Sequence, residues 1–293
     1  MKKLFGQSTF LLSAINVLLL CLISYQSAWA QSKKNKVLFI TIGDTKDLLH
    51  ATFPEDFKVK IGEECRKSIY HIEEVAHAIP GLDTTRVDFT GDRFSKKAVD
   101  QYLRSNQFNE HLKSATVVIC YVVTHGEADT DESEELPIVH FPDGQMRSTR
   151  FRDMLQEEGN DHLVLLMVEA CNHEPLDNEA TYGTQYTSAS DVSSDMLYQL
   201  FVENTGYIEM VSAARSYKSY VTGNGGLLAY YFRDYMLNIG YKADWAEVRT
   251  FLTRTIYTHQ PESSWMETLR GGKRVKVENF KPYISLDYLV DKK

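Results

Sequence analysis

Two long apolar runs interrupt an otherwise mixed pattern of hydrophobic and polar residues. The first runs from Val117 to Val123 and leads into His125, and the second runs from Leu163 to Val168 and leads into Cys171. Runs of this length that are rich in β-branched residues are typical of strands buried on both faces of a parallel sheet. Because parallel strands end at a common edge, we expect His125 and Cys171 to lie at the same edge of one sheet.

Strands and helices are predicted to alternate before these runs. A strand from Lys36 to Asp44 ends in a Gly-Asp turn, and an amphipathic helix from Ile61 to Ile79 follows. A strand from Thr85 to Phe89 and a helix capped by Ser95 come next. This order predicts a doubly wound α/β fold. Later elements are a hairpin around Pro142-Asp143-Gly144, a helix from Ser148 to Leu155, a helix near Asp191 to Val202, a strand from Tyr207 to Ala214, and helices at Leu227–Leu237 and Ala243–Tyr257.

The first thirty residues have the pattern of a signal peptide. Lys2 and Lys3 precede an apolar stretch from Phe10 to Ile23, and Ala28-Trp29-Ala30 forms a small-x-small cleavage site. We therefore expect residues 1–30 to be a leader and the mature protein to be secreted or periplasmic. Leu20, before Cys21, is not the small residue of a lipoprotein signal, so no stable membrane anchor is expected. An uncleaved anchor is the alternative.

Residues 31–293 are long enough for one α/β domain with a large core. Removing residues 1–30 takes away two lysines and no acidic residue, so the formal charge changes from −8 to −10. Nucleic-acid binding depends on clustered Lys and Arg, and this acidity argues against it.

Three cysteines remain after cleavage, which is too few for a disulfide framework. Cys65 falls on the apolar face of a predicted helix and Cys120 inside a predicted buried strand, so both are expected to pack in the core. Cys171 alone lies at a strand end. The acidic stretch from Asp129 to Glu135 is interpreted as a solvated loop, and residues 172–190 as a mobile loop because they are polar and turn-rich.

The strand ending in His125-Gly126 and the strand ending in Glu169-Ala170-Cys171, with 46 residues from His125 to Cys171, agree in order and spacing with one known group. The chain resembles the caspase-like cysteine peptidases, which include caspases, metacaspases and, more distantly, legumains and gingipains. Ser216–Tyr220, followed by Gly225-Gly226 and a helix, is similar to the strand and loop that line their substrate groove. Gln260-Pro261 resembles a segment near their C-terminal end.

The resemblance implies a caspase-like three-layer α/β/α sandwich around a mostly parallel sheet, and a cysteine endopeptidase activity that needs no cofactor and no metal. Cys171 would be the nucleophile and His125 its partner, acting as base or as the acid for the leaving amine. An imidazolium lowers the pKa of a neighbouring thiol, which favours the reactive thiolate. The N–H groups of Gly126 and Cys171 would bind the oxyanion.

Further residues are expected in the substrate groove. Glu169 precedes Cys171 by two positions, so on an extended strand both side chains point to the same side. In the family this position is commonly polar and close to the groove, and a structural ion pair is the alternative here. Asp44 could supply a negative charge to a pocket, with an ordinary Gly-Asp turn as the simpler account. The groove residues implied by the resemblance are Ser216, Tyr217, Ser219, Tyr220 and Val221.

The specificity residues of the family differ in this chain. Caspases select aspartate with an arginine just after the aromatic residue of the groove strand, and Val221 aligns with that arginine. Metacaspases select basic residues with an acid after a Ser-Gly-Cys sequence, where this chain has Ser212-Ala213-Ala214 followed by Arg215. A small or uncharged residue in the primary position of a peptide or protein substrate is therefore the hypothesis.

Other interpretations of the same residues remain open. His173 lies two residues from Cys171 and competes with His125 for the role of partner, and a zinc site of Cys171, His173 and His125 lacks a suitably spaced fourth ligand. A catalytically silent caspase-like domain that binds a peptide or a partner protein is a second class of function. A flavodoxin-like domain is disfavoured because no glycine-rich phosphate loop follows the first strand. Whether the protein is a monomer or a dimer is left open.

Overall fold

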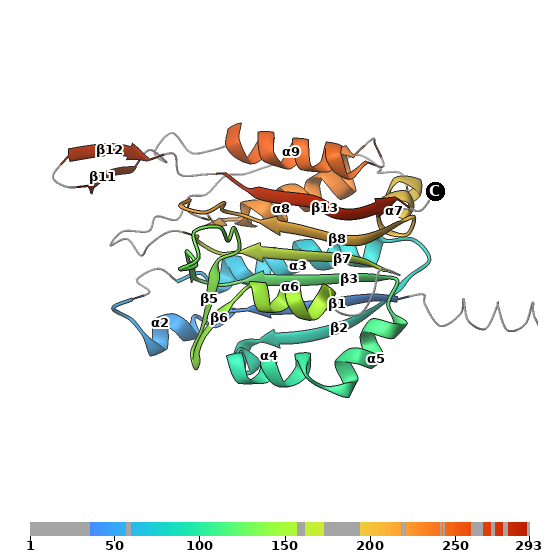
Figure 1. Cartoon of the computed structure of the whole chain (residues 1–293), viewed down its shortest axis with the longest axis horizontal. Helices are drawn as coiled ribbons and strands as arrows, with labels where there is room; N and C mark the ends of the chain where they lie inside the picture. Colours follow the sequence, from blue (N-terminus) through green and yellow to red (C-terminus); the bar gives the residue numbers. More distant parts are fainter. Residues whose placement is uncertain are drawn as a thin grey trace, which may run out of the picture. The chain divides into compact units, whose positions relative to one another are not determined.

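The main sheet has six strands in the order β13-β8-β7-β3-β1-β2 (Figure 1). Neighbours are parallel except β13 and β8, which are antiparallel. This computed structural model describes residues 36–56, 60–156, 162–172, 194–217, 219, 221–240, 242, 244–258, 266–270, 273–277 and 281–291. The strands are β1 (Lys36–Gly43), β2 (Asp83–Thr90), β3 (Val117–Val123), β7 (Leu163–Glu169), β8 (Asn204–Val211) and β13 (Tyr283–Asp291).

The central strands carry apolar residues on both faces, and this explains their unbroken hydrophobic runs. In β1, Val37 and Phe39 pack into one core while Leu38 and Ile40 pack into a second core on the opposite face. Successive side chains of a strand point to opposite faces, so a strand that is covered on both sides has apolar residues at successive positions. All seven residues of β3 are buried, and so are all seven of β7.

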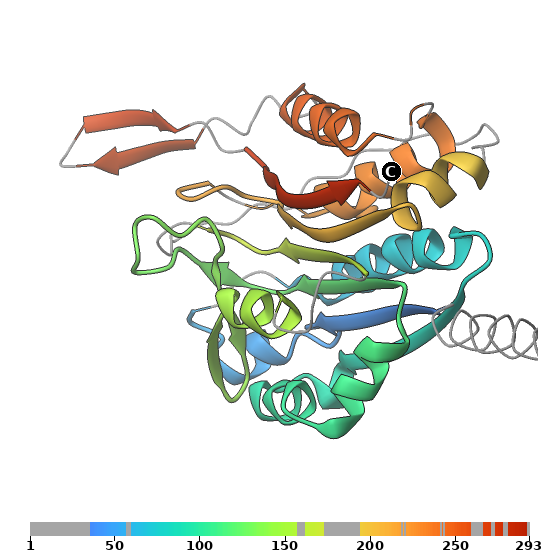
Figure 2. The same ribbon diagram turned by 45° about the vertical axis from the view of Figure 1, so that its right-hand side comes forward.

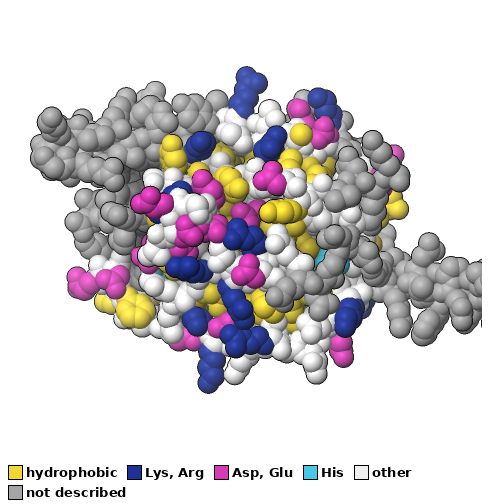
Figure 3. Space-filling model, viewed as in Figure 1, with side chains coloured by type: hydrophobic (Ala, Val, Ile, Leu, Met, Phe, Trp, Pro, Cys, Tyr) yellow, Lys and Arg dark blue, Asp and Glu magenta, His cyan; other side chains and the backbone are white. Residues whose placement is uncertain are grey.

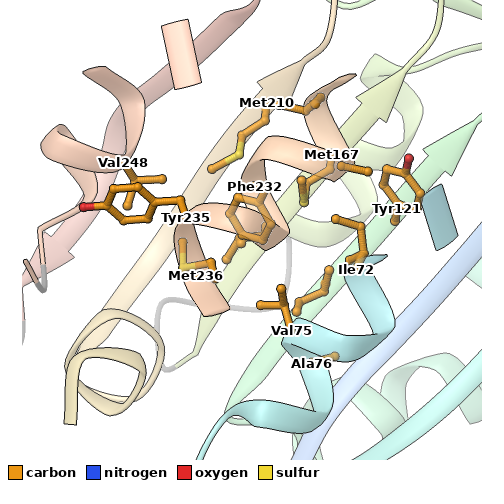
Figure 4. Close-up of a cluster of buried hydrophobic side chains, with 14 of the residues drawn as sticks. Ile72, Val75, Ala76, Tyr121, Met167, Met210, Phe232, Tyr235, Met236 and Val248 are labelled. Carbon is orange, nitrogen blue, oxygen red and sulfur yellow. The ribbon is translucent and has the colours of Figure 1, made fainter. Parts of the chain in front are cut away.

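Helices cover both faces of this sheet, as the two views in Figures 1 and 2 show. Figure 4 shows Ile72 and Val75 of one covering helix with Phe232 of another, next to Met167 and Met210 of the strands. The first core is formed with α3 (Gly62–Ala78), α7 (Ser194–Phe201), α8 (Leu227–Asp234) and α9 (Trp245–Thr258), and the second with α4 (Lys96–Leu103), α5 (Asn106–Ser114) and α6 (Thr149–Gln156). A mostly parallel sheet between two helical layers confirms the predicted α/β class.

Most predicted elements are present, with ends shifted by a few residues. Ser95 caps α4 as expected, since its hydroxyl accepts a hydrogen bond of 3.1 Å from Ala98 N. The predicted hairpin around Asp143 is formed by β5 (Ile138–Phe141) and β6 (Gly144–Arg147), and β4 (Gly126–Glu127) pairs with β5. The remaining elements are α2 (Leu48–Thr52), a 3-10 turn (Gly91–Arg93), the short pair β9 (Val221–Thr222) and β10 (Gly225–Gly226), a π-helical turn (Tyr235–Ile239) after α8, and β11 (Met266–Arg270) with β12 (Lys273–Val277).

Two elements of the sheet and its cover were missed. The pairing of β13 with β8 shifts register between Ser285 and Tyr288, so the two-residue period that predicts a half-buried strand is interrupted. Helix α5 buries only Phe108 and Leu112, which is too weak a pattern to mark a helix.

Candidate active site

His125 and Cys171 follow adjacent strands at the same edge of the sheet. Val123 of β3 is paired with Glu169 of β7, and Thr124 N donates a hydrogen bond of 3.3 Å to Glu169 O. His125 and Cys171 each come two residues after this pair. His125 is buried and Cys171 is half-buried.

Gly126 lies directly against the segment that contains Cys171. A Cβ atom placed on Gly126 would lie 2.8 Å from Ala170 Cβ and 2.8 Å from Cys171 O. Real side chains do not approach this closely, so only glycine allows the His125-Gly126 segment to pack on Ala170-Cys171. The structure therefore brings the two predicted segments into contact.

The backbone around Gly126 is held by the neighbouring hairpin. His140 N donates to His125 O at 3.0 Å, and Gly126 is paired with Val139. In an antiparallel ladder, a residue pair flanked by such a bond directs its own N–H groups away from the partner strand. The N–H of Gly126 is thus directed away from β5, as a donor to an oxyanion would need to be.

His140 is a second histidine at this edge, and the sequence analysis missed it. Its Nε2 lies 3.7 Å from Glu127 Oε2. Burial is the main influence on its pKa, which is lowered, while Glu127 opposes that shift. The alternation of Val139, His140 and Phe141 in β5 was the available signal, because it directs His140 away from the core.

Two residues of the predicted groove segment, Tyr217 and Ser219, lie close to Cys171 and Asn172. Asn172 and Tyr217 form an antiparallel bridge, and Cys171 Sγ lies 3.7 Å from Ser219 O. Ser219 is further held by Ser212, whose Oγ donates to Ser219 Oγ at 2.7 Å. Ser216 is exposed and has a φ of 73°, an uncommon backbone conformation outside glycine. Val221 begins β9, while Tyr220, His173, Gln260 and Pro261 lie outside the described residues.

The side chain of Glu169 lies in the core, which differs from both sequence expectations. It is 2 % exposed, and its carboxylate accepts hydrogen bonds from the hydroxyl of Tyr121 and the N–H groups of Leu228 (2.9 Å) and Ala229. A Cβ on Gly226 would clash with the Glu169 carboxylate, so the backbone at Gly226 passes directly over that carboxylate. Burial raises the pKa of Glu169 to about 7 despite these bonds. Glu169 therefore caps α8 from within.

Asp44 is also a buried helix cap. Its position agrees with an ordinary Gly-Asp turn and not with a charged residue in a substrate pocket. Its two carboxylate oxygens accept bonds from Leu48 N (2.7 Å) and Leu49 N (2.9 Å) at the start of α2. Burial raises the pKa of Asp44 from its usual value, and the backbone hydrogen bonds oppose this shift. A carboxylate placed in this way adds no charge to a surface groove.

The acidic segment 129–135 is solvated in its middle, where residues 130–133 are exposed, but its two ends are packed onto neighbouring elements. Glu135 Oε2 accepts a bond of 3.0 Å from Arg215 N, just before the groove segment. Glu134 forms a 2.7 Å ion pair with Arg152 of α6. Figure 3 shows the face that carries α6, where basic and acidic side chains lie among one another. The segment therefore joins the region after His125 to the start of the groove.

A separate cleft of about 430 Å³ lies between α3 and the α8 region. His71 Nε2 is 2.7 Å from Asn224 O within it, and Arg233 Nε is 3.0 Å from Glu74 Oε2. Its walls carry both acidic and basic side chains, and none of the predicted site residues lines it among the described residues.

Comparison with known proteins supports the fold. The sequence matches no protein-family model, and no curated protein was found to be similar to it. A solved structure of caspase-1 from Spodoptera frugiperda is similar with a TM-score of 0.52 at 12% identity, covering 86% of each chain. A Geobacter sulfurreducens protein has a TM-score of 0.49 at 12% identity, covering 85% of this chain and 92% of that one. The first of these shows a caspase-like fold. Among the described residues, no helix has the length and apolar character needed to cross a membrane.

Proposed function

We propose that this protein is an exported cysteine endopeptidase that uses Cys171 and His125. The observation that carries the proposal is the packing of His125-Gly126 against Ala170-Cys171 at the end of two adjacent parallel strands. Acyl transfer by a cysteine enzyme requires a nucleophilic thiol and an imidazole that exchanges protons, and here they come from separate elements. The caspase-like fold is consistent with this chemistry.

In the proposed reaction, the thiolate of Cys171 attacks the carbonyl carbon of the scissile peptide bond. The N–H groups of Gly126 and Cys171 stabilise the oxyanion, and such donors are worth about 3 kcal/mol each in the transition state. His125 gives a proton to the leaving amine as the C–N bond breaks, which leaves a thioester on Cys171. His125 then takes a proton from water, whose oxygen attacks the thioester carbon; the C–S bond breaks, the peptide leaves as a carboxylic acid, and the Cys171 thiolate beside protonated His125 is restored.

The peptide would lie along the segment from Ser216 to Val221. The Asn172–Tyr217 bridge and the 3.7 Å contact of Cys171 Sγ with Ser219 O support this proposal, since a peptide would bind there by pairing its extended backbone. Asp44 and Glu169, whose charges would favour a basic residue in the substrate, are buried as helix caps. A small or uncharged residue in the primary position therefore fits best. A positional scanning peptide library tests this, and cleavage only after Asp or only after Arg and Lys contradicts it.

Export is part of the proposal because residues 1–30 have the pattern of a leader. Mass spectrometry of the protein from the native host tests it. A mature N-terminus at Gln31 is expected, whereas recovery of the full chain from the cytoplasm contradicts export.

A peptidyl acyloxymethyl ketone with an uncharged primary residue tests the chemistry. We expect one label per chain, on Cys171, and loss of labelling in Cys171→Ala and His125→Ala. His140→Ala is the matched control, because His140 lies at the same edge. Loss of labelling in His140→Ala with retention in His125→Ala would transfer the role of the imidazole to His140.

The second candidate is a catalytically silent domain that binds a peptide or partner protein. The contact of 3.7 Å between Cys171 Sγ and Ser219 O favours it, because it directs the thiol to the groove strand. A silent domain would bind peptides equally well with Ala at position 171, and would show no labelling by the electrophile under reducing conditions.

A further inference from the structure

Asn172, the residue directly after Cys171, is completely buried. Its side-chain amide donates two hydrogen bonds to main-chain oxygens, to Glu135 O at 2.7 Å and to Ala213 O at 3.2 Å. Its own oxygen, Oδ1, has no hydrogen-bond partner within the described part of the chain. The side chain therefore acts as a donor to two carbonyl groups.

The main chain of Asn172 makes two more bonds, both to the groove segment. Asn172 N donates to Tyr217 O at 3.1 Å, and Ser216 N donates to Asn172 O at 2.6 Å. Ser216 has a φ of 73°, and a serine keeps such a conformation only where its surroundings impose it. The bond from Ser216 N to Asn172 O is one of those restraints.

These four bonds join Asn172 to two segments that are far from it in sequence, one at Glu135 and one at residues 213–217. Glu135 belongs to the segment after His125, Ala213 follows β8, and Ser216 and Tyr217 begin the groove. Glu135 is fixed in turn, because its Oε2 accepts from Arg215 N at 3.0 Å. Both segments therefore meet at the residue bonded covalently to Cys171.

We propose that Asn172 is a positioning residue that fixes the Cys171 thiol relative to the substrate groove. This inference rests on the proposed peptidase function and deepens it. An amide is required because both partners of the side chain are acceptors. Aspartate has nearly the same shape but would present a carboxylate to two carbonyl oxygens, which repels both segments.

The test compares Asn172→Asp with Asn204→Asp. Asn204 is a matched control, since it is 8 % exposed and its amide also donates to two carbonyls, Gln199 O (2.8 Å) and Leu200 O (3.1 Å), but it begins β8 and so lies at the opposite edge of the sheet. For each variant, the rate of labelling by the peptidyl acyloxymethyl ketone is divided by the rate with iodoacetamide. Both rates are measured where circular dichroism shows each variant to be folded, so this ratio reports alignment of a peptide with the thiol.

We expect this ratio to fall about 10- to 100-fold in Asn172→Asp, because small displacements of reacting groups have effects of that order. It should stay at the wild-type value in Asn204→Asp. Equal ratios in the two variants overturn the positioning role. If the wild type is labelled by iodoacetamide and not by the peptide reagent, the proposed peptidase function fails instead.

Asn172→Ser covers the case in which Asn172→Asp does not fold, since a hydroxyl can keep one of the two donor bonds. In that variant, hydrogen exchange at Ser216 N–H should be faster than in the wild type, while exchange in β8 is unchanged. This readout does not depend on catalysis. Unchanged exchange at Ser216 overturns the coupling of Asn172 to the groove.

Discussion

Glu169 Oε1 accepts a hydrogen bond of 2.9 Å from Leu228 N, so the strand that leads to Cys171 is bonded at its end to the first turn of α8. The carboxylate is buried, which disfavours its ionised form. The partial positive charge at the N-terminus of α8 favours the ionised form but offsets only part of this effect. The same side chain accepts from Tyr121 of β3. The ionisable side chain of Glu169 thus links its own strand β7 to β3 and to α8, next to the candidate site.

We predict that Glu169 makes stability depend on pH. Burial raises its pKa from 4.5 to about 7, so between these values the folded chain binds more protons than the unfolded chain. The free energy of unfolding therefore falls as pH rises through that range, by about 3 kcal/mol from this group. Glu169→Gln mimics the protonated form and should match the wild type at pH 5 and exceed it at pH 8. Urea unfolding at both pH values measures this, and Glu110→Gln is the control because Glu110 is an exposed residue of α5. Equal pH dependence in wild type and Glu169→Gln contradicts the prediction.

Arg152 is predicted to stabilise the ionised form of a second buried acid, Glu209, in the folded protein. Glu209 is 5 % exposed, its carboxylate lies 3.9 Å from Arg152 Nη1, and burial raises its pKa to about 7 while Arg152 opposes that shift. Arg152→Met should lower the free energy of unfolding by about 2 kcal/mol, and more at pH 8 than at pH 5, because the unpaired carboxylate is then ionised. Arg150→Met on the same helix is the control, since Arg150 pairs with the more exposed Asp100. An equal loss in both variants at pH 8 would show that Glu209 does not need Arg152.

Gly126→Ala should impair the site more than it impairs the fold. The new Cβ would lie 2.8 Å from Ala170 Cβ and from Cys171 O, and 2.9 Å from Ile138 O. Two of these atoms belong to the backbone, so the segment with the oxyanion donor must move. We expect a 10²- to 10³-fold loss of labelling by the peptide electrophile and a loss of stability of about 2 kcal/mol. Adding Ala170→Gly removes one of the three contacts, and full recovery of labelling in the double variant would contradict a backbone displacement.

Native alkylation should modify Cys171 and spare the other two described cysteines. Cys65 and Cys120 are fully buried, and burial raises the pKa of both thiols, that of Cys120 to about 12. Thiolates are the reacting species, so these two thiols are protected by access and by protonation. Peptide mapping after treatment with iodoacetamide, in native buffer and in urea, measures this. Modification of Cys65 or Cys120 at the native rate of Cys171 would be the contrary result.

The sequence alone determined the parallel strands of the sheet and the order in which His125 and Cys171 follow them, but not the antiparallel strand β13. Each of the strands that lead to His125 and Cys171 is a continuous apolar run because helices cover both of its faces, and that pattern is local and can be read from the chain. Parallel strands must end at one edge, so His125 and Cys171 had to be neighbours once the strands paired. The core positions of Cys65 and Cys120 followed from the same periodicity.

Only the tertiary structure decided what surrounds that edge. Glu169 and Asp44 have the sequence context of groove residues. Each instead accepts hydrogen bonds from the N-terminus of a later helix, because buried carboxylates need N–H partners. Asn172 carries no local signal, since its partners at Glu135, Ala213 and Tyr217 lie 37 to 45 residues away along the chain. The hydrophobic pattern of a strand repeats within a few residues, so it predicts the strands that lead to His125 and Cys171. Polar contacts between distant segments leave no such period, and these contacts set how the thiol meets its groove.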